Sequence, residues 1–200
     1  MKLPINLFDL LLFAILSAGL VRGRKQGFSV ELLSLLKWVT LLLACAVVYG
    51  PAGAAVAEVG SFDLLSAYLM AYLGTALAVF LVFSIIERRV GPKLAGSDIF
   101  GHAEYYLGMG SGLVRFACML LVGLALLNAR GFSPAELKEM DDFQVNNYGS
   151  KVFPTLHTLQ VEVFDRSLAG SWIKQDLPFL LISPTQTNER VSPPTQTAAK

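Results

Sequence analysis

Three charged residues lie inside long apolar stretches of the sequence, where a charge is unfavourable and needs an explanation. They are Asp9, Lys37 and Arg115. In a hydrocarbon environment, acidic and basic side chains often mark proton relays or ion paths. One hypothesis is therefore a small transporter or channel. Such a protein would have to be oligomeric, because the four membrane helices predicted below enclose little lumen.

Each of the three residues also has a structural interpretation. Asp9 lies three residues after Asn6 near a predicted helix start, where the helix dipole favours a carboxylate, and we prefer this interpretation. Lys37 can extend its stem toward the membrane surface. Arg115 can anchor its helix by pairing with Glu104 or with lipid phosphates. We do not expect Asp9 to pair with Lys37, because about 10–15 Å would separate them along the membrane normal.

The apolar stretches define the class of protein. Of the 200 residues, 54% are hydrophobic and 16% are charged, whereas about 25% are charged in a soluble domain. Four apolar runs are long enough, or nearly so, to cross a hydrocarbon core of about 30 Å as helices. They cover residues 5–21, 32–49, 64–86 and 112–127. The sequence thus predicts an all-α integral membrane protein with four transmembrane helices.

The predicted domain organisation has three parts. Residues 1–130 form the transmembrane domain, residues 131–182 form a small helical tail outside the membrane, and residues 183–200 are expected to be disordered because Pro, Thr and Gln dominate there. Within the first part, the glycine-rich stretch Leu94–Gly112 predicts an interfacial or partly inserted helix that runs into the fourth span.

Several local patterns predict where helices begin and end. Proline should end the second span at Gly50-Pro51 and the third at Gly91-Pro92. Ser133-Pro134-Ala135-Glu136 is typical of a helix start, and apolar spacing predicts a second tail helix over Thr155–Leu168. The apolar segment Leu177–Ile182 is too short to span a membrane. It should pack on the tail helices or lie at the membrane surface.

The loops predict the orientation. The loop after the first span carries Arg22, Arg24 and Lys25, and the loop after the third span carries Arg88, Arg89 and Lys93. The loop between the second and third spans carries no Lys or Arg. Positive loops stay in the cytoplasm, so both termini are predicted to be periplasmic. A cleaved signal peptide is the alternative for the first run, but there the positive charges follow the apolar stretch instead of preceding it.

Other kinds of chemistry find little support in the sequence. A net charge of +1 offers no electrostatic basis for binding nucleic acid. Neither of the two histidines has a Cys or His at metal-ligand spacing, so we expect no metal and no cofactor. Gly108 and Gly112 resemble a phosphate-binding loop only superficially, and we interpret them as a face for close helix packing. No polar cluster lies at one depth, so we expect no enzymatic activity.

Two stretches of the sequence resemble the colicin V production protein family of small bacterial inner-membrane proteins. The first contains Asn6-Leu-Phe-Asp9, Arg22-Gly23, Gly27-Phe28 and Glu31 to Trp38, and the second contains Glu104-Tyr-Tyr-Leu-Gly108, Gly112 and Arg115. The second stretch is similar to the family's Asp-Arg-x-Leu-Gly-x-x-x-Gly-x-x-Arg-Gly. This chain has Glu104 in place of Asp, Tyr105 in place of Arg and Phe116 in place of Gly.

The resemblance covers roughly residues 1–129 and implies a role in producing or exporting the colicin V toxin, or more generally in envelope processes. It implies no known reaction. We therefore predict an accessory or scaffold protein of the inner membrane. Its expected partners are the lipid bilayer and other membrane or envelope proteins, or further copies of itself. The candidate functional polar residues are Asp9, Arg22, Lys37, Glu104 and Arg115.

Overall fold

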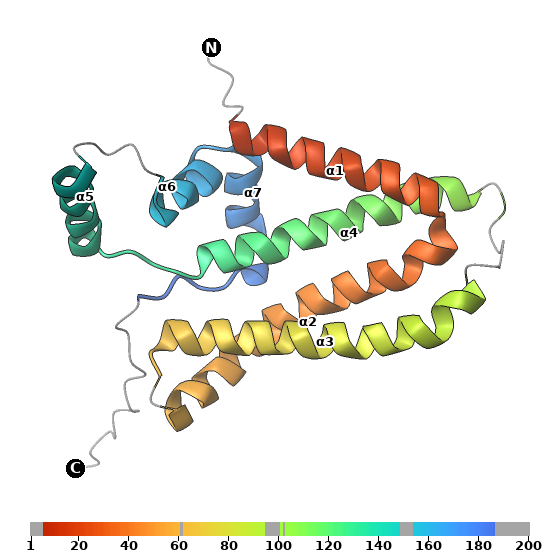
Figure 1. Cartoon of the computed structure of the whole chain (residues 1–200), viewed down its shortest axis with the longest axis horizontal. Helices are drawn as coiled ribbons and strands as arrows, with labels where there is room; N and C mark the ends of the chain where they lie inside the picture. The colour runs from red at the N-terminus through yellow and green to blue at the C-terminus, as the bar shows by residue number, and fades with distance from the viewer. Residues whose placement is uncertain (1–5, 61, 95–100, 102, 149–153, 187–200) are drawn as a thin grey trace.

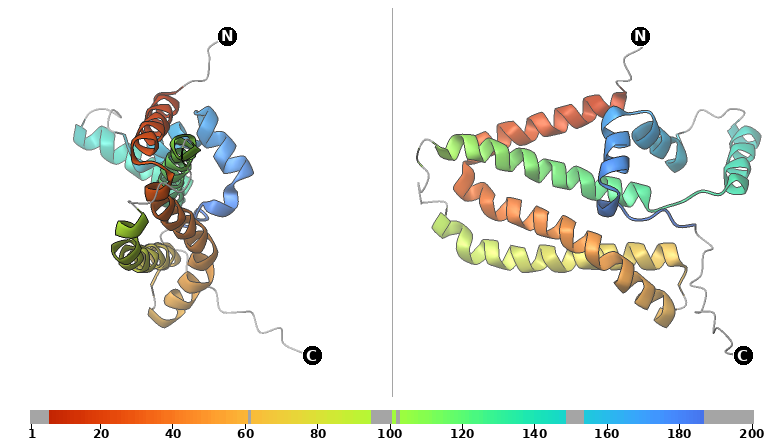
Figure 2. Two further views of the ribbon diagram at one scale, coloured as in Figure 1. Left: turned by 90° about the vertical axis from the view of Figure 1, so that its right-hand side faces the viewer. Right: turned by 180° about the vertical axis from the view of Figure 1, so that it is seen from behind.

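Four long helices account for the apolar stretches in the computed structural model, which describes residues 6–60, 62–94, 101, 103–148 and 154–186. The helices are α1 (Leu7–Gln26), α2 (Phe28–Gly60), α3 (Leu64–Leu94) and α4 (Ala103–Asn128). They run lengthwise in alternating directions, with α1 beside α4 and α2 beside α3 (Figure 1). Because α2 also contacts α4, the order across the bundle is α1, α4, α2, α3, as the views in Figure 2 also show.

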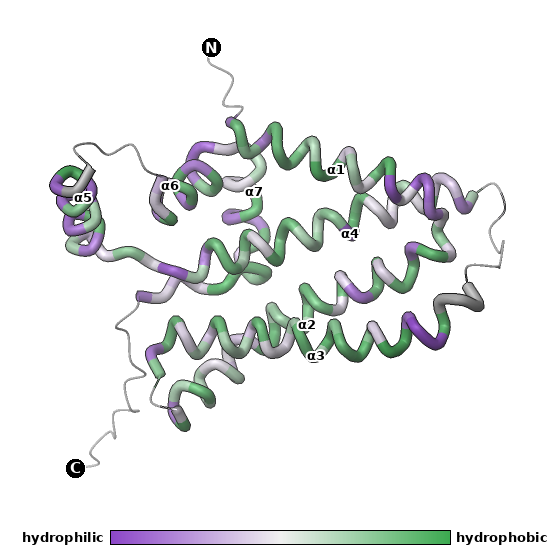
Figure 3. Tube along the Cα trace, viewed as in Figure 1, coloured by the Kyte–Doolittle hydropathy of each residue, from purple (hydrophilic) through white to green (hydrophobic). Residues whose placement is uncertain are grey.

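Apolar residues occupy much of the length of these helices (Figure 3), and many of the large ones are exposed. Phe13 and Val47, for example, are 70% and 73% exposed. So large an exposed apolar surface suits lipid and not water. Three of the described helices, α2, α3 and α4, are long and apolar enough to cross a membrane. In α1, the uncharged run between Asp9 and Arg22 covers only 12 residues, 10–21.

Two helix ends predicted from prolines are wrong. The helix α2 continues through Pro51 to Gly60, and α3 continues through Gly91 and Pro92 to Leu94. Proline removes one backbone donor and disturbs the preceding turn, but it does not always end a helix. In a bilayer, a continuous helix satisfies the other backbone groups, which favours tolerating the proline. Both helices therefore extend beyond the predicted spans.

The predicted interfacial helix over Leu94–Gly112 is not a separate element where the structure describes it. From Ala103 onward this stretch is the first part of α4, a single helix of 26 residues. Residues 95–100 and 102 lie outside the described residues. Of its glycines, Gly108 and Gly112 face α1 at close range, as predicted for a packing face.

A single residue, Gly27, joins α1 to α2. Its φ is +75°, a value that side chains with a Cβ rarely adopt. Its N–H donates to the Gly23 carbonyl oxygen at 3.1 Å and closes α1, and α2 begins at the next residue. The tight turn brings the start of α2 under the end of α1, close to the start of α4.

A helical tail follows α4 and folds back onto one end of the bundle. Of its elements, α5 stands apart from the bundle, while the others lie close to α4 and to the start of α1 (Figure 1). They are α5 (Pro134–Tyr148), α6 (Leu156–Gln160), the π-helical turn η1 (Val161–Asp165), α7 (Leu168–Asp176) and the 3-10 turn η2 (Pro178–Leu180).

The helix start predicted at Ser133 is confirmed. The Glu136 N–H donates to Ser133 Oγ at 3.2 Å, and the Ser133 N–H donates to the Glu136 carboxylate at 3.0 Å. The helix predicted over Thr155–Leu168 is confirmed only as far as Asp165. It stops there because Ser167 begins a new helix, with its Oγ accepting the Gly170 N–H at 2.8 Å.

The short apolar segment near the end of the tail belongs to the core of the bundle. Leu181 is 4% exposed and Ile182 is fully buried, in one cluster with Leu124 and Ala125 of α4. Order also extends beyond Ser183, where the disordered end was predicted to begin. Thr185 is buried, and its N–H donates to the Ala129 carbonyl oxygen at 2.9 Å. Residues 187–200 lie outside the described residues.

Candidate functional site

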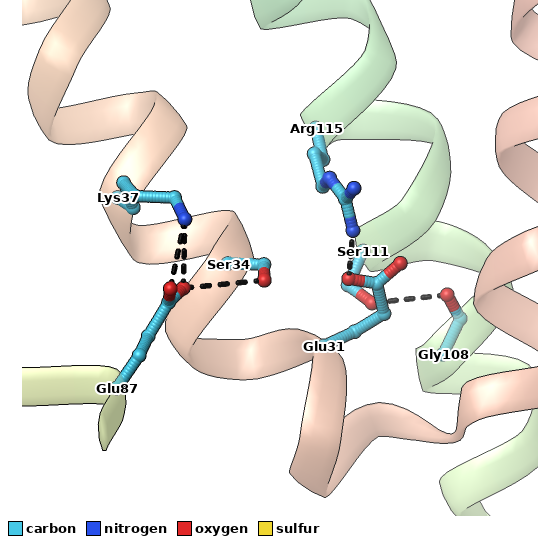
Figure 4. A network of polar contacts seen from close by, with 7 residues as sticks. All are labelled: Glu31, Ser34, Lys37, Glu87, Gly108, Ser111 and Arg115. Carbon is cyan, nitrogen blue, oxygen red and sulfur yellow. Dashed lines mark hydrogen bonds and ion pairs between the residues drawn. The ribbon is translucent and has the colours of Figure 1, made fainter. Parts of the chain in front are cut away.

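An ion pair joins α2 to α3 near the end of the bundle where α1 turns into α2. Lys37 Nζ lies 2.9 Å from both carboxylate oxygens of Glu87 (Figure 4). The two side chains are 10% and 28% exposed. Ser34 Oγ also donates to the same carboxylate, at 3.4 Å. Lys37 thus has a partner of opposite charge on the neighbouring helix, as a charge inside a membrane helix requires.

A second ion pair joins α2 to α4 and is more deeply buried. Arg115 Nη1 lies 2.6 Å from Glu31 Oε2, and the Glu31 side chain is only 1% exposed (Figure 4). The sequence suggested Glu104 or lipid phosphates as partners of Arg115, so this partner is a correction. Because Glu31, Ser34 and Lys37 are spaced by three residues, α2 presents one polar strip toward both neighbours.

Some hydrogen-bonding capacity remains around the second pair. Glu31 Oε1, Arg115 Nε and Ser29 Oγ are buried and have no hydrogen-bond partner among the described residues. Such groups are unfavourable in an apolar environment. Nearby, Ser111 Oγ donates to the Gly108 carbonyl oxygen at 2.9 Å. The pair thus has buried donor and acceptor groups that no described residue satisfies.

Glu104 supports the start of α2 from the first turn of α4. Its carboxylate accepts the Ser29 N–H at 3.1 Å. A carboxylate at this position satisfies one of the free amides at a helix start and interacts favourably with the helix dipole. Tyr105, which stands where the family pattern has Arg, lies under the guanidinium of Arg24 with 4.7 Å between Cζ and the ring centroid. Arg22 is exposed on α1.

Asp9 connects two helix starts at the opposite end of the bundle. Its carboxylate accepts the Asn6 N–H at 3.1 Å and so completes a capping box at the start of α1. It also accepts the Leu168 N–H at 3.2 Å and the Ala169 N–H at 3.1 Å, both at the start of α7. The structure therefore places Asp9 at a helix start, as the preferred interpretation has it. Its additional contact with the tail was not visible in the sequence.

The contact of Asp9 with α7 gives a testable prediction. The variant Asp9→Ala removes a capping carboxylate from the starts of both α1 and α7. A lost cap typically lowers the free energy of unfolding by about 1–2 kcal/mol. We expect faster hydrogen exchange in Leu168–Asp176 and unchanged exchange in α3. Asp176→Ala is the matched control and should leave α7 protected. Unchanged exchange of α7 in Asp9→Ala would contradict the capping role.

Glycines allow α1 and α4 to cross with their backbones in contact. A Cβ on Gly108 would lie 2.6 Å from the Gly23 carbonyl oxygen, and one on Gly19 would lie 2.9 Å from the Gly112 carbonyl oxygen. A Cβ on Gly23 or Gly112 would collide with the backbone of the opposite helix as well. Gly108 and Gly112 therefore form one side of a two-sided glycine contact. The α1 side was missed, although the Gly19-x-x-x-Gly23 spacing is the same signal.

Two acidic partners were also missed by sequence reasoning, Glu31 and Glu87. Glu87 comes directly after the predicted third span, which ends at residue 86. A comparison of depths would have found it: Lys37 lies about two and a half turns after the start of α2, and Glu87 lies about two turns before the end of α3, on that same side of the bundle. The Asp9–Lys37 contact that the predicted depths excluded is not found among the described contacts.

The fold and these contacts define an all-helical membrane protein whose buried charges tie neighbouring helices together. The family model described as "Colicin V production protein" matches residues 8–155. The chain therefore belongs to the colicin V production protein family. No match was found among curated proteins or among solved structures.

Proposed function

We propose that this chain is a multi-pass scaffold of the bacterial inner membrane that supports toxin production or export and related envelope processes. One observation carries the proposal. Asp9, Lys37 and Arg115, the three residues on which a transporter would depend, each hold a contact that joins separate helices. Groups engaged in this way stabilise a bundle and are poorly suited to carry ions through it. The bundle then serves to present the tail.

We further propose that α1 also spans the membrane, which brings the number of spans to four. It runs antiparallel to α4 (Figures 1 and 2), the backbone at Gly23 meets that helix closely, and Leu12 lines an apolar pocket together with Leu120 of α4. A helix that accompanies a membrane-spanning helix over this length occupies the same depth. Four spans with positive loops in the cytoplasm put both termini in the periplasm.

The side of the membrane that holds the tail tests this topology. Alkaline phosphatase and, separately, a fluorescent protein would be fused after Lys200, because Ile182 and Thr185 are buried and a fusion near them would disturb the core. We expect phosphatase activity without fluorescence. Fluorescence without phosphatase activity would mean an odd number of spans or an inverted chain, and would overturn the proposed topology.

The scaffold and transporter hypotheses predict different losses of function. The readout is toxin release from cells in which this chain is the only family member, at matched membrane levels. A scaffold should fail when α5 is replaced by a flexible linker, because α5 stands apart from the bundle and is available to partners (Figure 1). It should tolerate the double variant Lys37→Met with Glu87→Gln, which removes both charges of one pair together.

The opposite pattern would favour a transporter. If the double variant abolishes toxin release while its membrane level holds, the Lys37–Glu87 pair acts in the process itself and the scaffold proposal fails. If replacing α5 leaves toxin release unchanged, that result would contradict the scaffold proposal too. Deleting the whole tail from Gly131 would be a poor test, because Leu181 and Ile182 belong to the core and their loss would unfold the bundle.

A further inference from the structure

A pocket of about 210 Å³ lies where α4 ends and the tail folds back. Its walls come from five parts of the chain: the end of α4, the stretch leading from it, the α6–η1 segment, α7, and the stretch after η2. The residues that matter for its chemistry are Arg130, Phe132, His157, Gln160, Asp165 and Lys174. None of them takes part in the ion pairs between α2, α3 and α4.

The guanidinium of Arg130 packs against an aromatic ring, and one of its donors has no partner in the described part of the chain. Its Cζ lies 4.8 Å from the centroid of the Phe132 ring, which packs edge-on against His157 at 5.6 Å. Arg130 Nε is buried and has no hydrogen-bond partner among the residues that the structure describes. A buried donor of this kind on a positioned guanidinium is suited to a ligand that accepts hydrogen bonds.

The balance of charge and hydrogen-bonding groups in the pocket favours an anion. Lys174 Nζ lies 3.2 Å from Asp165 Oδ1, so this pair is neutral overall and leaves the charge of Arg130 uncompensated. The carbonyl oxygens at the end of α4 would repel an anion. Gln160 Nε2, however, donates hydrogen bonds to the carbonyl oxygens of Leu127 and Arg130, at 2.6 and 2.8 Å.

The position of the pocket indicates which anion. It lies at the end of a membrane-spanning helix, which is the level of the lipid headgroups. The donors that line it are the guanidinium of Arg130, the ammonium of Lys174 beside Asp165, and the imidazole of His157, and groups of these kinds bind phosphate oxygens. We propose that this pocket binds a phosphate group, as carried by an anionic phospholipid headgroup. The inference does not depend on which side of the membrane holds the tail.

The test uses the full chain purified in a maltoside detergent, which carries no phosphate. Binding of dihexanoyl phosphatidylglycerol, of the uncharged dihexanoylglycerol and of inorganic phosphate would be titrated separately. We expect the phosphatidylglycerol to bind at least tenfold more tightly than dihexanoylglycerol, since a charge-assisted hydrogen bond contributes at least about 1.4 kcal/mol, a factor of ten. If inorganic phosphate competes with the phosphatidylglycerol, the pocket is a site for free phosphate. If it does not compete, the pocket is a site for the lipid headgroup. Either result supports the proposal.

Variants show whether the binding occurs in this pocket. Arg130→Gln should weaken phosphatidylglycerol binding about tenfold. Arg166→Gln, an exposed arginine of the same tail paired with Glu162 outside the pocket, should leave it unchanged. If Arg130→Gln lowers the melting temperature, the exposed Lys174→Gln replaces it and should weaken binding by a smaller factor. Equal binding of the charged and uncharged lipids, or equal loss in Arg130→Gln and Arg166→Gln, would overturn the proposal.

Discussion

Replacing the arginine in Arg115→Met is expected to lower the free energy of unfolding by about 3–5 kcal/mol, because it leaves the Glu31 carboxylate buried without a cation. Glu31 is 1% exposed and its second oxygen already lacks a partner among the described residues. Water cannot solvate the charge that remains, and no other basic side chain contacts it in the described part of the chain. The measurement is unfolding of the full chain in mixed detergent micelles.

A double variant and a surface control separate the causes of this loss. Glu31→Gln combined with Arg115→Met removes both charges, so it should recover a large part of the stability lost in Arg115→Met. Arg166→Met breaks the exposed Arg166–Glu162 pair and should change stability by no more than about 0.5 kcal/mol. If the double variant is as unstable as Arg115→Met alone, the unpaired charge is not the cause.

The second large effect is expected at the glycine crossing. Gly108→Leu puts a side chain against the Gly23 carbonyl oxygen, which lies 2.6 Å from the Cβ position. The obstacle is backbone and cannot rotate away, so α1 and α4 must separate and lose their contact. Overpacking of this kind costs about 3 kcal/mol. We expect lower stability and a lower yield of folded protein in the membrane.

Gly110 is the matched control for this experiment. It lies two residues further along the same helix, and a Cβ there would meet nothing within 4 Å. Gly110→Leu should therefore leave stability unchanged or raise it slightly, because leucine is the better helix former. Equal losses in Gly108→Leu and Gly110→Leu would show that the crossing does not depend on close backbone contact.

The pattern of hydrophobic residues was sufficient to predict the class of protein and much of its secondary structure. A run of about 20 apolar residues has few alternatives to a membrane helix, because each backbone polar group must be satisfied within the segment. Local caps such as Ser133 with Glu136 were predictable for a similar reason, since the groups involved lie within four residues of each other. Glycine spacing indicated the packing face at Gly108 and Gly112.

The ends of the helices were not predictable from single residues. Pro51 and Pro92 were expected to stop helices, yet α2 and α3 pass through both. Whether a proline ends a helix depends on what surrounds the freed carbonyl group, and neighbouring elements decide that. The same holds for Thr185, whose surrounding composition predicts disorder but whose backbone pairs with Ala129 and Gly131.

The sequence by itself determined that this chain is a helical membrane protein of the colicin V production family, because hydropathy and motif spacing are properties of short segments. Only the tertiary structure decided which charges meet. Glu31 and Arg115 are separated by 84 residues, and Asp9 and Ala169 by 160. Contacts over such separations depend on how the helices are ordered and rotated in the bundle. That arrangement is set by the sum of all packing contacts, and no short segment carries it.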